Sequence, residues 1–146
     1  MEADHASDGV GPLAERFRAL FKTHLGHLPH AESFADGNEL VVPAPDAALG
    51  ELRVRDDGDE LTICVGPHHW HVPVYRFQDE SEERRADRVA ETAVADVRRL
   101  VEGQTVIRVR RRADGSIGRT SSLDAECARE LPPTADEVEY VWTGRR

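Results

Sequence analysis

Three histidines fall within four positions in the stretch GPHHWHVPVYRF, residues 66–77, and imidazole serves proteins both as a zinc ligand and as a general base. If this stretch is a strand, successive side chains point to opposite faces of the sheet. His69 and His71 then share one face, while His68 and Trp70 share the other. Two histidines at positions i and i+2 of a strand can bind one zinc ion, so His69 and His71 are candidate metal ligands.

A zinc site needs a third and usually a fourth ligand. Three more histidines recur at every third position near the end of the first predicted helix: His24, His27 and His30. They would approach the strand if this helix packs beside it, but Gly26 interrupts the regular spacing. No H-E-x-x-H arrangement and no cysteine pair accompanies either group. Two interpretations stay open: a zinc site at His69 and His71, or strand histidines that are half-exposed beside polar partners.

A catalytic histidine requires a nucleophile and an orienting acid within reach. The sequence has no G-x-S-x-G motif, and Ser121 and Ser122 lie in a predicted hairpin arm. Cys64 and Cys127 are far apart, form no C-x-x-C pair, and are expected to be free thiols. We therefore predict a protein that is not an enzyme and has no cofactor. A histidine-based metal-binding protein or hydrolase is the alternative.

The formal net charge is −9 over 146 residues, and the acidic excess lies in the first half. Residues 1–60 hold 13 acidic and 5 basic side chains. Such a field repels nucleic acid and anionic membranes and attracts basic partners. We predict a basic protein partner that meets four neighbouring carboxylates and two exposed aromatic side chains. These residues are Asp56, Asp57, Asp59, Glu60, Trp70 and Trp142.

One strand carries a basic pattern, because Arg108, Arg110 and Arg112 alternate and share one face. No aromatic residue lies among these arginines, whereas sites for single-stranded nucleic acid combine basic and aromatic side chains. The pattern favours a solvated sheet face, contact with an acidic protein, or pairing with the acidic half of the same chain. We do not expect nucleic acid as a partner.

Two segments, about 12–26 and 80–102, carry apolar residues at helical spacing. Pro12 suits the first turn of the first helix. Asp79, followed three residues later by Glu82, predicts a capping box at the start of the second helix.

The remaining segments alternate in hydrophobicity and are separated by turn residues. A tight turn at Asp57-Gly58 joins ELRVR to ELTICV, and further hairpin turns are predicted at 36–38 and 113–115. A short helix over 124–131 precedes the final strand VEYVWTG. This order predicts the α+β class, with a mostly antiparallel sheet of five to seven strands packed by two main helices.

We predict a flexible N-terminus over residues 1–10 and a single domain over 11–146. The first residues lack the basic and apolar regions of a signal peptide, and no segment approaches the ~20 apolar residues that span a bilayer. A cytoplasmic protein without membrane contact is therefore expected.

Residues 12–143 resemble two groups of bacterial proteins in the order of their predicted elements, which is helix, strands, long helix and strands. These are the immunity proteins that neutralise partner toxins and the small acidic chaperones of secretion systems. The resemblance rests on architecture, and no functional residue is carried over from it. It implies a stoichiometric binding protein whose acidic surface meets a basic partner.

Overall fold

The computed structural model describes residues 11–33, 39–46 and 49–145. The N-terminal segment 1–10 and the predicted turn at 36–38 lie outside these residues. In chain order the described elements are α1 (Pro12–Leu25), β1 (Ala31–Ser33), β2 (Glu39–Val42), β3 (Leu52–Asp56), β4 (Glu60–Val65), β5 (His68–Pro73), the 3-10 helix η2 (Val74–Phe77), α2 (Glu82–Val101), β6 (Thr105–Arg111), β7 (Ile117–Asp124), α3 (Ala125–Glu130), β8 (Glu137–Val141) and β9 (Gly144–Arg145).

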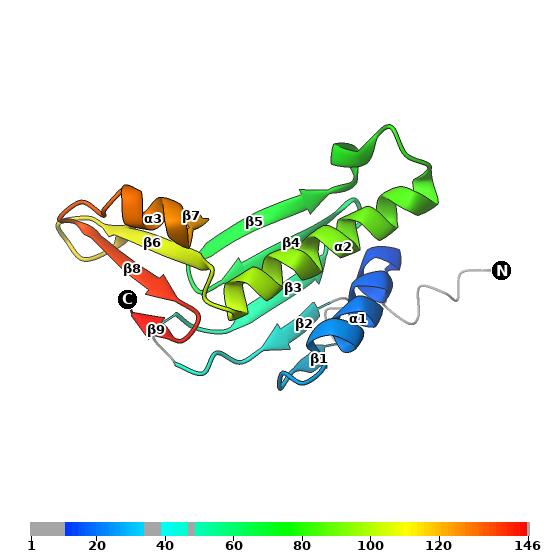
Figure 1. The fold of residues 1–146 in the computed structure, drawn as a ribbon, viewed down its shortest axis with the longest axis horizontal. Coiled ribbons are helices and arrows are strands. Elements are labelled where there is room, and N and C mark those ends of the chain that lie inside the picture. Colours follow the sequence, from blue (N-terminus) through cyan, green and yellow to red (C-terminus); the bar gives the residue numbers. More distant parts are fainter. Residues whose placement is uncertain (1–10, 34–38, 47–48, 146) are drawn as a thin grey trace.

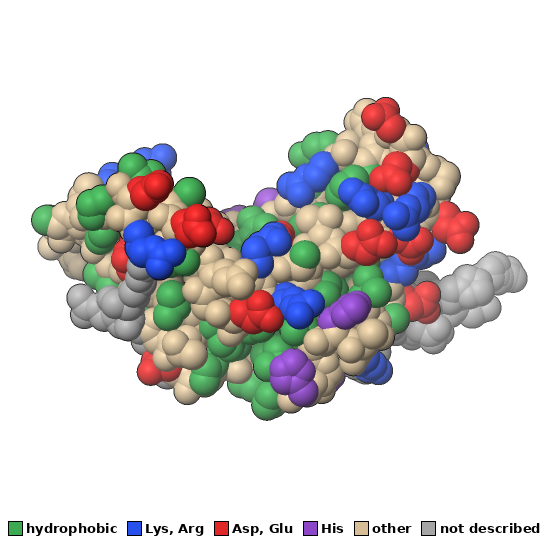
Figure 2. All heavy atoms as spheres, viewed as in Figure 1, with side chains coloured by type: hydrophobic (Ala, Val, Ile, Leu, Met, Phe, Trp, Pro, Cys, Tyr) green, Lys and Arg blue, Asp and Glu red, His purple; other side chains and the backbone are tan. Residues whose placement is uncertain are grey.

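The described strands form two antiparallel sheets (Figure 1). The first has the order β1-β2-β3-β4-β5, and the second has the order β7-β6-β8-β9. The predicted α+β class, the antiparallel pairing and the two main helices are confirmed. The division of the strands between two sheets is a feature that the sequence pattern does not predict. Figure 2 shows that the surface is hollowed between the end that carries the second sheet and the end that carries η2.

Helices α1 and α2 pack against each other and cover the same face of the five-stranded sheet (Figure 1). The alternation of β3 and β4 places their apolar residues on this face, where they are at most 3 % exposed: Leu52, Val54, Leu61, Ile63 and Val65. Their burial, together with the apolar stripes of both helices, forms the main core. No helix in the described part of the chain covers the opposite face, which we call the open face.

The start of α1 is capped from β3. Gly11 offers no capping side chain, and Asp56 Oδ2 instead accepts a hydrogen bond of 2.9 Å from the Ala14 backbone N–H. Asp56 Oδ1 accepts a second bond, of 2.7 Å, from the Gly58 N–H in the turn that follows β3. A Cβ on Gly11 would lie 2.3 Å from Asp56 Oδ2, so glycine is required for this close approach. Asp56 thus joins α1 to the sheet.

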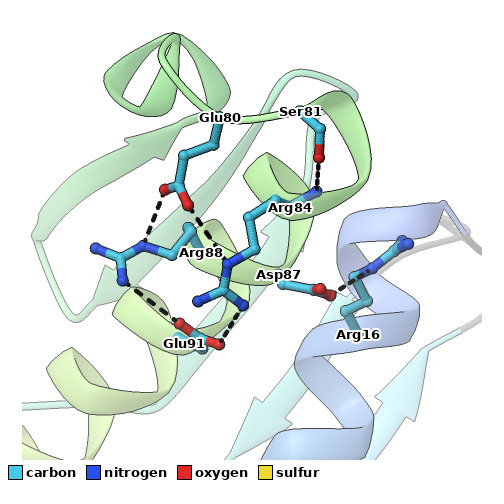
Figure 3. Close-up of polar contacts among 7 residues, drawn as sticks. All are labelled: Arg16, Glu80, Ser81, Arg84, Asp87, Arg88 and Glu91. Carbon is cyan, nitrogen blue, oxygen red and sulfur yellow. Dashed lines mark hydrogen bonds and ion pairs between the residues drawn. The ribbon is translucent and has the colours of Figure 1, made fainter.

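The start of α2 differs from the prediction. Ser81, rather than Asp79, is the N-cap residue, and its hydroxyl accepts a hydrogen bond of 3.2 Å from the Arg84 N–H (Figure 3). The chain is still turning after η2 at this point, which places Asp79 before the cap. Farther along α2, Asp87 accepts a 2.9 Å hydrogen bond from Arg16 of α1, so a polar contact also links the two helices (Figure 3).

Charged residues around the first half of α2 pair with one another in a closed ring (Figure 3). Glu80 lies 3.4 Å from Arg84 Nε and 3.3 Å from Arg88 Nε. Glu91 lies 3.4 Å and 3.9 Å from the Nη1 atoms of the same two arginines. Exposed ion pairs contribute about 0–1 kcal/mol each, so the ring mainly balances charge at this end of the helix.

In the second sheet, a buried ion pair holds α3. Arg108 Nε donates to Glu139 Oε2 at 2.7 Å, and the two side chains are 9 % and 11 % exposed. The same guanidinium donates to the backbone carbonyls of Ala128 and Leu131, at the end of α3. Five N–H donors on a planar group allow this single arginine to satisfy a carboxylate and two carbonyls together.

The predicted basic strand is therefore paired within the chain. Arg110 lies 3.3 Å from Asp136 and 3.6 Å from Glu137, beside the buried pair of Arg108 and Glu139. These two arginines pair within the chain, but the predicted pairing with the acidic first half is wrong. The acidic partners belong to β8 and the residue before it, not to the acidic first half.

We expect that Asp56→Ala lowers the free energy of unfolding by about 1–3 kcal/mol, because α1 loses its cap and two backbone N–H groups lose their acceptor. Urea denaturation followed by circular dichroism measures the change. Asp59→Ala, which removes an exposed carboxylate from the same turn, should stay within about 0.5 kcal/mol of the wild type. Equal losses in both variants would contradict the capping role.

Replacement of Arg108 by Met should cost about 3 kcal/mol, because the largely buried Glu139 carboxylate then loses its ion pair with the guanidinium. The double variant Arg108→Met, Glu139→Leu should recover a large part of that loss. Chemical denaturation of the wild type, both single variants and the double variant completes the cycle. A double variant that is no more stable than Arg108→Met would show that the ion pair is not the source of the effect.

Candidate functional site

The histidine-rich stretch forms β5, and its side chains alternate as predicted. Trp70 pairs with Ile63 of the core face, while His69 pairs with Cys64 and His71 with Thr62 on the open face. His69 and His71 are exposed, and Trp70 is half-buried and packs against the core. The two predicted metal ligands therefore share a face with β4 residues, and that face is turned away from both main helices.

On the open face, His71 is held by neighbouring oxygen atoms. Its Nδ1 lies 2.7 Å from Glu60 Oε2 and 3.1 Å from Thr62 Oγ1. The Thr62 hydroxyl is also in a short contact with Asp57 Oδ2, and a hydroxyl has one proton to donate. If that proton goes to the Asp57 carboxylate, Nδ1 of His71 must be the donor to Glu60. Nε2 is then the ring nitrogen left for an outside group.

Asp57 remains ionised because of its hydrogen bonds. Burial alone would raise the pKa of its carboxyl, but the hydrogen bonds from Thr62 and Arg55 outweigh this effect and lower the pKa. Arg55 Nε donates to Asp57 Oδ1 at 2.8 Å. Asp59 is exposed in the same turn, and Glu60 follows it at the start of β4. We call Asp57, Asp59 and Glu60 the acidic turn.

The acidic turn and the two histidines form a continuous surface, but they do not form a metal cluster. The rings of His69 and His71 lie edge to face, with centroids 5.2 Å apart. Within residues 11–33, 39–46 and 49–145, no three His, Cys, Asp or Glu side chains are arranged to hold a metal ion. The α1 region does not supply the third ligand, since α1 packs on the other face of the sheet and the His30 ring contacts Phe21 at 5.0 Å.

The six residues predicted to meet a partner lie in three different environments. Asp57, Asp59 and Glu60 are accessible in the acidic turn, as described above. Asp56 is 8 % exposed and caps α1, and Trp142 is 5 % exposed in the core. Neither side chain is accessible to a protein partner as it stands in this structure. Trp70 lies on the helix side of β5, opposite the acidic turn.

Trp70 lines a groove of about 360 Å³ between β5, the end of α2 and β7. Its Nε1–H donates to Asp96 Oδ2 at 3.0 Å, and Arg99 pairs with the other oxygen of Asp96. Asp124, at the end of β7, lines the same groove. The sequence analysis missed these three charged residues, because they come from elements that no local pattern brings together.

Comparison of the chain with protein-family models, curated protein sequences and solved structures finds no match. The functional argument therefore rests on the geometry of the two surfaces described above. None of the helices in the described part of the chain has the length and apolarity required to cross a bilayer.

Beside the groove, the burial of His68 predicts a pH dependence of stability. Its Nδ1 is 2.9 Å from Thr120 Oγ1, and its ring centroid is 5.7 Å from that of Trp70. Burial, with a smaller effect of the neighbouring His69, lowers the pKa of His68. The folded state therefore prefers the neutral ring more strongly than the unfolded chain does. This contribution to stability is complete above about pH 6.5 and is lost as the pH falls through the lower, folded value.

We expect His68→Asn to weaken the pH dependence of the unfolding free energy between pH 7.5 and pH 5, because asparagine does not titrate and can still bond Thr120. Urea denaturation of both proteins at several pH values measures the difference. The wild type should lose more stability than the variant as the pH falls. Parallel curves would contradict a lowered pKa of His68.

Proposed function

We propose that this protein is a non-catalytic binding module that holds a basic protein partner in a stoichiometric complex, in the manner of immunity proteins or secretion chaperones. The observation that carries this proposal is the acidic turn. Its three carboxylates lie together at the edge of a sheet face that no described helix covers.

The distribution of charge supports this surface over others. The ring on α2 combines two arginines with two glutamates, and Arg108 and Arg110 are paired with acidic residues of the same chain. In the acidic turn, Arg55 balances the carboxylate of Asp57, and Glu60 contacts the imidazole of His71. An uncompensated negative field there would steer a basic protein into the encounter complex.

The histidines give this surface hydrogen-bonding capacity beside its charge. Glu60 fixes the orientation of His71 through Nδ1, which leaves Nε2 for a partner group. Thr62 is 2 % exposed and links His71 to Asp57, so the surface has a preformed polar network. A surface that is already ordered loses less conformational entropy on binding.

The test compares two triple variants that change the net charge equally. Asp57→Asn, Asp59→Asn and Glu60→Gln neutralise the acidic turn, and Asp79→Asn, Glu83→Gln and Glu130→Gln neutralise exposed carboxylates elsewhere. Wild type and both variants are used as baits in cell extract, and captured proteins are quantified by mass spectrometry. We expect a basic protein that the wild type and the second variant retain and the acidic-turn variant loses.

The association rate with that purified protein is then measured against salt concentration. Electrostatic steering predicts a rate that falls as salt rises, and a loss of about tenfold or more in the acidic-turn variant at low salt. A rate that does not depend on salt, or a partner retained equally by all three baits, would contradict the proposed function.

A further inference from the structure

The groove at Trp70 combines an aromatic ring with carboxylates. The indole is fixed by its hydrogen bond to Asp96, and Asp96 is also paired with Arg99. Asp124 caps α3, because its Oδ1 accepts a hydrogen bond of 2.8 Å from the Glu126 backbone N–H. Its Oδ2 is left for other contacts. The two carboxylates outnumber the one guanidinium, so the charged groups of the groove sum to one negative charge. Aromatic faces beside carboxylates attract cations.

One wall of the groove is an edge strand. Within the described residues, β7 pairs with β6 and has no strand on its other side. Thr120, Ser122 and Asp124 alternate along β7 and so share one face, and Thr120 bonds His68 of β5 beside the groove. The β7 stretch TSSLD, residues 120–124, contains no lysine, arginine or proline, which commonly protect an edge from further pairing.

These two features suit one kind of ligand. An extended segment added to β7 would make backbone hydrogen bonds along its edge, and these give affinity. Its alternate side chains would lie on the same face as Ser122 and Asp124, toward Trp70, and this gives specificity. Burial lowers the pKa of His68, so the imidazole next to Trp70 is neutral at neutral pH and does not repel a cation.

We propose that the groove binds an extended basic segment of the partner, which pairs with the edge of β7 and places a lysine or arginine side chain against Trp70 and Asp124. This inference rests on the proposed function, since it assumes a basic protein partner. It adds a second contact region on the opposite side of β5 from the acidic turn. A partner that uses both regions would enclose the β4–β5 edge of the sheet.

The experiment uses three synthetic probes and the 146-residue chain labelled with ¹⁵N. The probes are acetyl-Thr-Val-Arg-Val-Thr-amide, the same peptide with citrulline for arginine, and the arginine peptide with N-methylated valines. The Nε1–H signal of Trp70 reports binding, and the signal of the buried Trp142 serves as an internal control. Trp70→Phe assigns the two signals, because it removes one of them.

We expect the arginine peptide to shift the Trp70 signal and to leave the Trp142 signal in place. The citrulline peptide has the same shape without the charge, and we expect it to bind at least about fivefold more weakly. The N-methylated peptide should be weakened by a similar factor. Asp124→Asn should weaken the arginine peptide similarly, while its amide still caps α3. Asp79→Asn, an exposed residue outside the groove, should have no effect.

Several results would overturn the proposal. Equal binding of the citrulline peptide would exclude cation recognition, and equal binding of the N-methylated peptide would exclude pairing with β7. An unmoved Trp70 signal at millimolar arginine peptide would exclude the basic ligand. A partner that is lost by the acidic-turn variant but retained by Asp124→Asn would refute binding at the groove and leave the proposed function in place.

Discussion

The five-stranded sheet has both main helices on one face, and this one-sided cover determines where each side chain of the strands can act. Every residue of β3, β4 and β5 belongs either to the core or to the open face, because successive side chains alternate. In β5, the same alternation sends Trp70 to the helix side and His71 to the open face. The side chains of the histidine-rich stretch therefore belong to two separate surfaces and do not form one cluster.

The second sheet depends on the first for its position. Helix α2 rises about 1.5 Å per residue, so its 20 residues carry the chain back along the sheet before β6 begins. The buried residues Ile107 and Val109 of β6 and Trp142 then join the main core. Because the two sheets share this core, β7 comes to lie beside β5, and the groove between them is a consequence of that packing.

Local signals account for most of the fold that could be predicted. Both helices, the turn at Asp57-Gly58 and the hairpin arms around 113–115 follow from periodicity and turn residues. The cap of α2 was misplaced at Asp79, because Ser81 and Asp79 are both good caps and the 3-10 turn before them decides between the two. The separation into two sheets could not be predicted, since it depends on contacts between residues far apart in the chain.

By itself, the sequence determined the alternation of His68 to His71 and the surplus of carboxylates at 56–60, since both are local properties of residue type and order. Only the tertiary structure decided which of these groups are accessible. It buried Asp56 against the start of α1 and Trp142 in the core, and it brought Asp96 and Asp124 to Trp70. The physical reason is that exposure depends on what packs against a side chain, and the packing elements here come from distant parts of the chain.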